Sequence, residues 1–230
     1  MISGIYYSNT GLNTIQLRID VNANNIANVN TVAFKQERTS VSTFKEKLVA
    51  VNRLNLLHTS QGAACRDIRT DFSSGMLLNT GRQLDFALTQ EGVFFTLQTG
   101  EGLKYTRNGS FRVNNQGELV DINGYPVLGY SGTITVNDGT PEQGFYLVAF
   151  DDLEQLSRQG GYFIPRPGAA ERPVENVEVK QGYLETANVD LVNSLSELLV
   201  NSRQYALNSR VIATYDAILR KAANEVGSLK

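Results

Sequence analysis

Apolar residues near the N-terminus recur at alternating spacings of three and four, the period of a helix that packs along one face. The recurring positions are Ile5, Ser8, Leu12, Ile15, Ile19, Asn22, Ile26 and Val29. This heptad pattern predicts a helix that runs into the asparagine-rich stretch "NANNIANVN", with Ser8 and Asn22 as polar members of the seam. Because Thr10 before Gly11 is a suitable helix cap, we expect the first turn to be irregular.

The C-terminal segment carries the same pattern over a longer span. Its recurring positions are Leu191, Leu195, Leu198, Ser202, Tyr205, Ser209, Ile212, Asp216, Leu219, Ala223 and Val226. Neither glycine nor proline occurs between Asp190 and Val226, and Gly227 is a natural stop. Such a helix is ~55 Å long. A second apolar row widens the stripe, which should therefore face more than one neighbour. This row consists of Val192, Leu199, Ala206 and Ala213.

The middle of the chain has the period of strands. The run "GVFFTLQTG" is apolar and bounded by glycines, and "LKYTRNGSFRV" alternates on both sides of Asn108-Gly109. Asn-Gly between alternating runs predicts a hairpin with a type I′ turn. A second turn is expected at Asn123-Gly124, and further strands at residues 118–122, 133–136 and 145–150, the last of them central in the sheet. Together these segments predict a β-meander.

Two stretches are less regular. Residues 36–72 mix charged and apolar residues and predict a short helix followed by an extended arm. Residues 157–176 contain two adjacent glycines and three prolines, which predict a loop. The expected domains are therefore an N-terminal helix with its asparagine motif at residues 1–35, an arm at 36–72, a β domain at 73–185 and a C-terminal helix at 186–230.

The predicted fold class is α+β. Each terminal helix has an apolar seam that the β domain, with apolar strands of its own, is not obliged to cover. We therefore expect the helices to pack with each other as a coiled-coil-like axial domain. One such pair leaves the second C-terminal row exposed, and an exposed apolar row indicates a partner.

Composition argues against several function classes. The net charge of −2 gives no basic surface for nucleic acid. His58 and Cys65 are the only residues of their types, the aspartates lack metal-ligand spacing, and no phosphate-binding or dinucleotide-binding glycine loop is present. We therefore expect no enzyme activity, cofactor or metal. No run approaches the ~20 apolar residues of a membrane span, and the first residues lack the pattern of a cleaved secretory signal.

Three motifs resemble the bacterial flagellar axial family of rod, hook and hook-associated proteins. "ANNIANVNTVAFK" is similar to the family's A-N-N-[IL]-A-N-x-x-T-x-G-[FY]-[KR] signature. The central segments "SGMLLNTGRQLDFALTQEGVFF" and "YTRNGSFRVNNQGELVDINGYPVLG", and the terminal "ANVD" and "SRQYALNSRVI", also resemble it. One position departs from the signature, because Ala33 stands where the family has glycine. If that position has positive φ, Ala33 carries a strain that glycine avoids.

The resemblance implies a structural subunit of the flagellar rod, most like the proximal rod members because of the compact length and the "KAANEVG" ending. It implies helical polymerisation through the terminal helices, which would transmit torque and enclose the export channel. The implied partners are copies of the chain, other rod proteins, surrounding basal-body ring proteins and the flagellar type III export apparatus. The implied location is the basal body, where the rod crosses the periplasm, reached without a cleaved signal.

Two alternatives remain open. One is another axial protein, either a distal rod or a small hook-like subunit, and the axial position in the basal body would separate it from a proximal member. The other is a secreted β-domain binding module that a coiled coil joins into a closed bundle. A discrete small oligomer in solution would favour that module.

The seams and the motif give the expected subunit contacts. On the N-terminal side they are Leu12, Ile15, Ile19, Asn22, Asn25, Ile26, Asn28 and Phe34, and on the C-terminal side Leu191, Leu195, Leu198, Leu199, Arg203, Tyr205, Asn208, Ile212 and Leu219. We expect Asn22, Asn25 and Asn28 to bond to adjacent subunits. Capping of turns, or exposure to solvent, is the alternative for each of them.

Five asparagines between residues 22 and 30 weaken the N-terminal helix by ~3 kcal/mol as an upper sum. We therefore expect residues 12–30 of the unassembled chain to exchange their amide protons quickly and to become ordered between subunits. Hydrogen exchange on the soluble monomer measures this, and strong protection of these amides would refute it.

Overall fold

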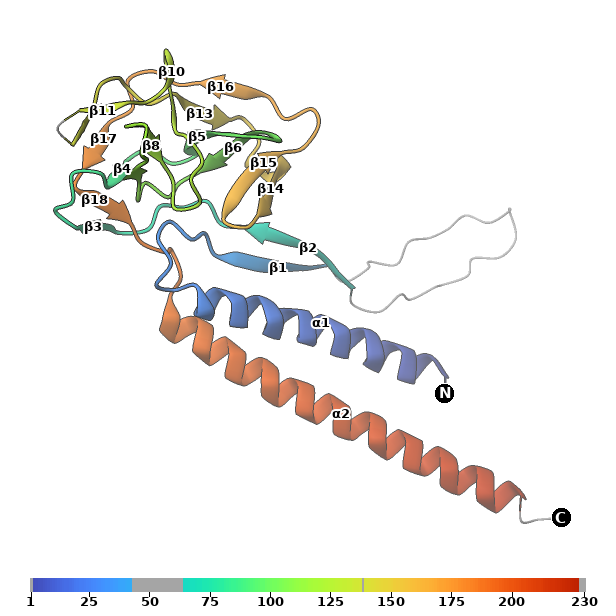
Figure 1. Ribbon diagram of the computed structural model, residues 1–230. Coiled ribbons are helices and arrows are strands. Elements are labelled where there is room, and N and C mark those ends of the chain that lie inside the picture. The colour runs from blue at the N-terminus through green and yellow to red at the C-terminus, as the bar shows by residue number, and fades with distance from the viewer. Residues whose placement is uncertain (1, 43–63, 138, 228–230) are drawn as a thin grey trace. The chain divides into compact units, whose positions relative to one another are not determined.

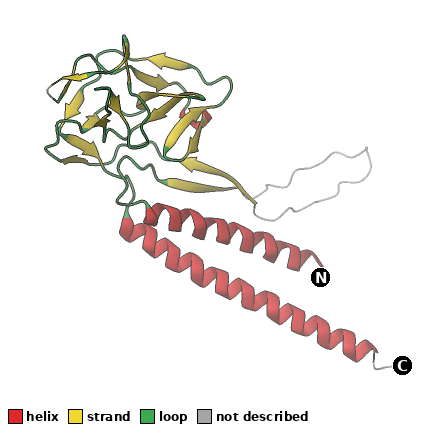
Figure 2. Ribbon diagram, in the orientation of Figure 1, coloured by secondary structure: helices red, strands yellow, loops and turns green. Residues whose placement is uncertain are grey.

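The computed structural model describes residues 2–42, 64–137 and 139–227, and these form two units. The helical unit comprises the described residues of 1–26, 37–69 and 191–230. The β unit comprises residues 27–36 and 70–190. The fold is α+β, with a helix at each end and a β-rich centre, as the sequence predicts. Figure 2 shows the two helices in red and the strands in yellow.

The helical unit contains α1 (Ile2–Ala27), α2 (Leu191–Gly227) and the strands β1 (Glu37–Ser42) and β2 (Ala64–Thr70), which pair with each other. Helix α2 ends at the predicted glycine. The prediction of an irregular first turn near Thr10 is wrong, because α1 continues through Gly11. The hydroxyl of Thr14 donates to the carbonyl of Thr10 (2.9 Å), so Thr10 is an interior residue rather than a cap. Most of the segment predicted as a short helix lies outside the described residues.

The β unit is built on a six-stranded antiparallel sheet with the order β14-β15-β6-β5-β13-β16 (Figure 1). Its strands are β5 (Val93–Thr99), β6 (Gly102–Thr106), β13 (Leu147–Phe150), β14 (Leu156–Gln159), β15 (Tyr162–Pro165) and β16 (Glu171–Pro173). The predicted central strand is therefore interior, since β13 lies between β5 and β16. A short 3-10 helix, η1 (Leu153–Gln155), precedes β14.

Five two-stranded ladders complete the β unit. They pair β3 (Leu77–Asn79) with β18 (Tyr183–Glu185), β4 (Phe86–Leu88) with β17 (Val179–Gln181), β7 (Arg112–Val113) with β8 (Leu119–Val120), β9 (Leu128–Gly129) with β10 (Gly132–Thr133), and β11 (Val136–Asn137) with β12 (Thr140–Pro141).

Apolar clusters cover both faces of the main sheet. Along β5 the side chains of Val93, Phe95 and Leu97 join one cluster, whereas Phe94 joins the other. Successive side chains of a strand point to opposite faces, so the apolar run of β5 supplies both clusters. The β unit therefore has its own core.

The hairpin predicted at Asn108-Gly109 is wrong. Strand β6 pairs with β5 and β15, while β7 pairs with β8 across the turn at Asn114–Gly117, so the strands do not form one meander. Gly109 does not have the positive φ of a type I′ turn. It is needed for close packing instead, because its carbonyl accepts from the amide of Phe86 (3.0 Å) and a Cβ there would lie 1.7 Å from the Phe86 carbonyl oxygen. The turn at Asn123-Gly124 is present, with Gly124 at φ 85°.

The loop predicted at residues 157–176 is also wrong, because this stretch supplies most of β14 and the whole of β15 and β16. Gly160 and Gly161 have φ of 59° and 89° and join β14 to β15 as a two-residue hairpin. Pro173 lies in β16, an edge strand of the sheet, where a missing amide donor is tolerated. The glycines and prolines thus mark a hairpin and a sheet edge.

We predict that Gly109→Ala lowers the free energy of unfolding by about 1–3 kcal/mol, because the new methyl group collides with the Phe86 main chain. Gly100→Ala is the matched control, since no atom lies within 4 Å of a Cβ built there. Urea denaturation followed by near-ultraviolet circular dichroism measures both, and the control should change by less than about 0.5 kcal/mol. Equal unfolding midpoints for the two variants would contradict the close approach.

Candidate functional site

A buried carboxylate, that of Glu185 at the end of β18, forms ion pairs with two positively charged side chains of the β unit, Lys35 and Arg107. Its side chain is 1% exposed. One oxygen, Oε1, accepts from Lys35 Nζ at 2.7 Å and from the amide of Gly75 at 2.9 Å. The other, Oε2, accepts from Arg107 Nε at 2.9 Å and lies 2.8 Å from Nη2. Both oxygens are therefore satisfied by donors from distant parts of the sequence.

Main-chain carbonyls satisfy the remaining donors of the two cations. Arg107 Nη1 donates to the carbonyls of Gln90 (2.6 Å) and Val93 (2.8 Å), and Lys35 Nζ donates to that of Ser73 (2.7 Å). Burial lowers the pKa of Lys35, because losing water costs the ammonium more than the attraction of Glu185 returns. The network is thus a buried, charge-paired structural site.

Ala33 adopts φ of 55°, in the left-handed region. The strain anticipated at this departure from the glycine of the family signature is therefore present, and such a conformation costs an alanine roughly 1–2 kcal/mol. The amide of Ala33 donates to the main-chain carbonyl of Glu185 (2.8 Å), which helps to hold this conformation.

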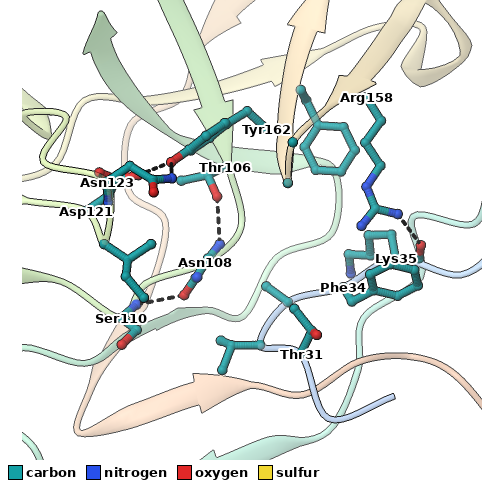
Figure 3. Close-up of a pocket in the computed structure, with 16 residues that line it drawn as sticks. Thr31, Phe34, Lys35, Thr106, Asn108, Ser110, Asp121, Asn123, Arg158 and Tyr162 are labelled. Atoms are coloured by element: carbon teal, nitrogen blue, oxygen red, sulfur yellow. Dashed lines mark hydrogen bonds between the residues drawn. The ribbon is translucent and has the colours of Figure 1, made fainter. Parts of the chain in front are cut away.

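Next to this network is a cleft of about 170 Å³ (Figure 3). The guanidinium of Arg158 stacks on the ring of Phe34 at 4.0 Å, and its Nη1 donates to the carbonyl of Lys35 at 3.2 Å. The hydroxyl of Tyr162 bonds to the carboxylate of Asp121, and burial raises the pKa of that hydroxyl. The guanidinium of Arg158 and the hydroxyl of Tyr162 thus each have a partner within the β unit.

The described residues contain no group of three His, Cys, Asp or Glu side chains that could hold a metal ion. His58 lies outside the described residues. None of the helices in the described part of the chain has a stretch apolar enough and long enough to cross a membrane.

Three asparagines of the motif bond within their own chain. Asn25 is 0% exposed and pairs with the main chain of Glu37, its Nδ2 donating to the carbonyl (2.7 Å) and its Oδ1 accepting from the amide (2.9 Å). Asn22 donates from Nδ2 to Glu197 Oε2 (3.3 Å), which links α1 to α2. Asn28 accepts at Oδ1 from the hydroxyl of Thr31 (3.2 Å). Bonds to adjacent subunits stay a prediction.

The expected contact residues of α1 lie on its covered face. Ile15 is buried with Asn22, while Leu12, Ile19 and Ile26 are half-buried. The row beside this seam is covered as well; it consists of Thr14, Val21 and Asn25. Phe34, which lies beyond the helix, is buried within the β unit.

The expected contact residues of α2 divide between two faces. Leu198, Asn208, Ile212 and Leu219 are half-buried, and Tyr205 is at the border of exposure. Exposed to solvent are Leu191, Leu195, Leu199 and Arg203. Ser194 and Asn201 are buried beside Leu198, and sequence reasoning missed both because they are small or polar.

Sequence reasoning also missed Arg107 and Glu185. Each is a single charge inside or next to a strand, and periodicity assigns such residues to the solvent side. The sequence analysis noted Lys35 only as the last residue of the motif. Its position directly after the aromatic Phe34 was the one available sign that this lysine is buried.

Family models match three parts of the chain. Residues 5–35 match "Flagella basal body rod protein", residues 89–143 match "Flagellar hook protein FlgE/F/G D1 domain", and residues 180–225 match "Flagellar basal body rod FlgEFG protein C-terminal". The flagellar basal-body rod protein FlgG of Bacillus subtilis is 31% identical, with 97% of this chain and 99% of that protein covered.

The chain belongs to the flagellar basal-body rod family. Two further relatives support this assignment over full lengths. The basal-body rod protein FlgF of Rhizobium meliloti is 30% identical, with 99% of each chain covered. The flagellar hook-basal body complex protein FlhO of Bacillus subtilis is 27% identical over the whole of both chains. The first family model ends at Lys35, so the motif and the buried lysine fall within one matched segment.

We predict that Glu185→Gln lowers the free energy of unfolding by about 3–5 kcal/mol, because two buried cations lose their counter-charge. The control is Glu175→Gln, at an exposed position of the same unit, which should change stability by less than about 0.5 kcal/mol. Urea denaturation of both purified proteins provides the measurement. The network would be energetically unimportant if the two variants unfolded at the same urea concentration.

Proposed function

We propose that this chain is a structural subunit of the flagellar basal-body rod and that it polymerises through α1 and α2. The observation that carries the proposal is the apolar surface of α2. Val192 is 72% exposed, Leu199 61% and Leu207 60%, and other large apolar side chains of the helix are exposed as well. They are Leu191, Leu195, Val200, Tyr205, Val211, Tyr215 and Ile218.

An apolar surface of this kind is costly in water and marks a contact with other chains. The exposed residues occur along most of the length of α2. The β unit also exposes some apolar side chains, such as Met76 and Ile122, but it has two buried apolar clusters of its own. Packing of the α2 surface against α1 and α2 of neighbouring subunits would bury it in a coiled-coil-like bundle. A contact repeated between unlike faces produces a helical filament rather than a closed oligomer.

The subunit would act as a building block and not as an enzyme, in keeping with relatives whose names describe rod proteins. Its partners would be copies of itself and other rod proteins, and the bundle would enclose the export channel and transmit torque. Relatives named FlgG and FlgF match at 31% and 30% identity, so the proposal concerns the rod as a whole and leaves the proximal or distal position open.

We predict that Leu199→Asp abolishes incorporation into the rod and leaves the isolated chain as stable as before, because Leu199 is exposed in the single chain. A buried charge in the assembled bundle would be strongly unfavourable. The experiment expresses the variant in cells that lack the wild-type chain, then measures its amount in purified basal bodies together with swimming.

Gln204→Asp is the matched control, since it places the same residue at an exposed polar position of the same helix. It should be incorporated normally. Wild-type amounts of Leu199→Asp in basal bodies would refute the assignment of this surface to assembly.

A further inference from the structure

Three segments of the chain meet around Glu185 in the β unit. Residues 33–36 follow α1, residues 71–75 follow β2, and residues 185–188 precede α2. Each segment connects the β unit to an element of the helical unit, so their mutual contacts decide where the chain leaves the β unit.

Glu185 bonds to both of the other segments. Its carboxylate accepts from Lys35 Nζ and from the amide of Gly75, while its main-chain carbonyl accepts from the amide of Ala33. The main chains are also in close contact, since a Cβ on Gly75 would lie 2.0 Å from the carbonyl oxygen of Thr186.

Asn188, three residues after Glu185, also bonds to both of the other segments. Its Oδ1 accepts from the amide of Gln36 (2.7 Å), and its Nδ2 donates to the carbonyls of Asp71 (2.9 Å) and Ser73 (3.0 Å). Its own amide donates to the carbonyl of Phe34 (3.3 Å). One side chain thus joins all three segments through main-chain groups.

Every bond named here connects two residues of the β unit, and residues 27–36 group with the β strands although they continue directly from α1. In these bonds the main-chain amides of the other two segments donate to Glu185 and Asn188, which belong to neither α1 nor α2. The contacts therefore do not require the helices to be packed.

We propose that residues 33–36, 71–75 and 185–188 form a junction that is folded in the unassembled chain, with Glu185 and Asn188 as its positioning residues. The chain then comes from α1 into the β unit, and passes from the β unit into α2, at two adjacent points that are fixed before any neighbour binds. For a rod subunit, the ends of both helices are in register when assembly begins; this consequence alone depends on the proposed function.

Hydrogen exchange on the full-length monomer tests the junction directly. The amides of Ala33, Gln36 and Gly75 should exchange as slowly as those of β5, which lie in the core of the same unit. Exchange at residues 33–36 as fast as at residues 12–26 of α1 would overturn the proposal.

Asn188→Ala tests the positioning role. The Gln36 amide should then exchange about tenfold faster, the factor that corresponds to losing one hydrogen bond, while the β5 amides keep their rates. Asn30→Ala is the matched control, because Asn30 is an exposed asparagine of the N-terminal motif, and it should leave Gln36 unchanged. An unchanged Gln36 rate in Asn188→Ala would refute the role of Asn188.

These outcomes are independent of rod assembly, because they are measured on the monomer. A fast-exchanging junction would leave the rod assignment intact, and a failure of Leu199→Asp to block incorporation would leave the junction intact. If Asn188→Ala did not fold, the wild-type exchange rates would still decide whether the junction is folded in the unassembled chain.

Discussion

The β unit depends on one buried negative charge. A carboxylate without water is costly unless cations and donors surround it, and Glu185 obtains them from Lys35 and Arg107, which are far apart in the sequence. Two positively charged side chains face one carboxylate, and main-chain carbonyls of residues 73, 88, 90 and 93 accept further hydrogen bonds from them. The segments that contain these carbonyls are thereby fixed as well. Together with Asn188, the side chain of Glu185 joins the segments before and after the β strands.

The two units differ in how far they bury their apolar side chains. The main sheet has a cluster on each face, and these clusters bury most phenylalanine side chains of the β unit within a single chain. On helix α2 most of the large apolar residues are exposed. The β unit therefore has a core within a single chain, whereas much of the apolar surface of α2 is available for other chains, as expected of a subunit that folds first and assembles afterwards.

Periodicity predicted the elements that depend on local sequence. Both terminal helices, the glycine stop after Val226 and the interior strand at residues 147–150 follow from apolar spacing. Strand pairing was not predictable in the same way, because Asn108-Gly109 carries a hairpin signature and is instead required by the close approach of Phe86. The buried charges were not recognised for a related reason. Their partners are distant in the sequence, so no local pattern distinguishes Glu185 from a solvent-exposed glutamate. The α1 seam, by contrast, was visible, and Ile15 and Asn22 are buried on it.

The pairing of Asn25 with residue 37 constrains what sequence can follow the motif. The Nδ2 and Oδ1 atoms of the Asn25 side chain bond to the main-chain carbonyl and amide of Glu37. Position 37 therefore needs a main-chain N–H, and proline would remove this donor. The motif thus recognises the main-chain conformation of the first residue of β1. The end of α1 and the start of β1 are thereby joined through main-chain groups.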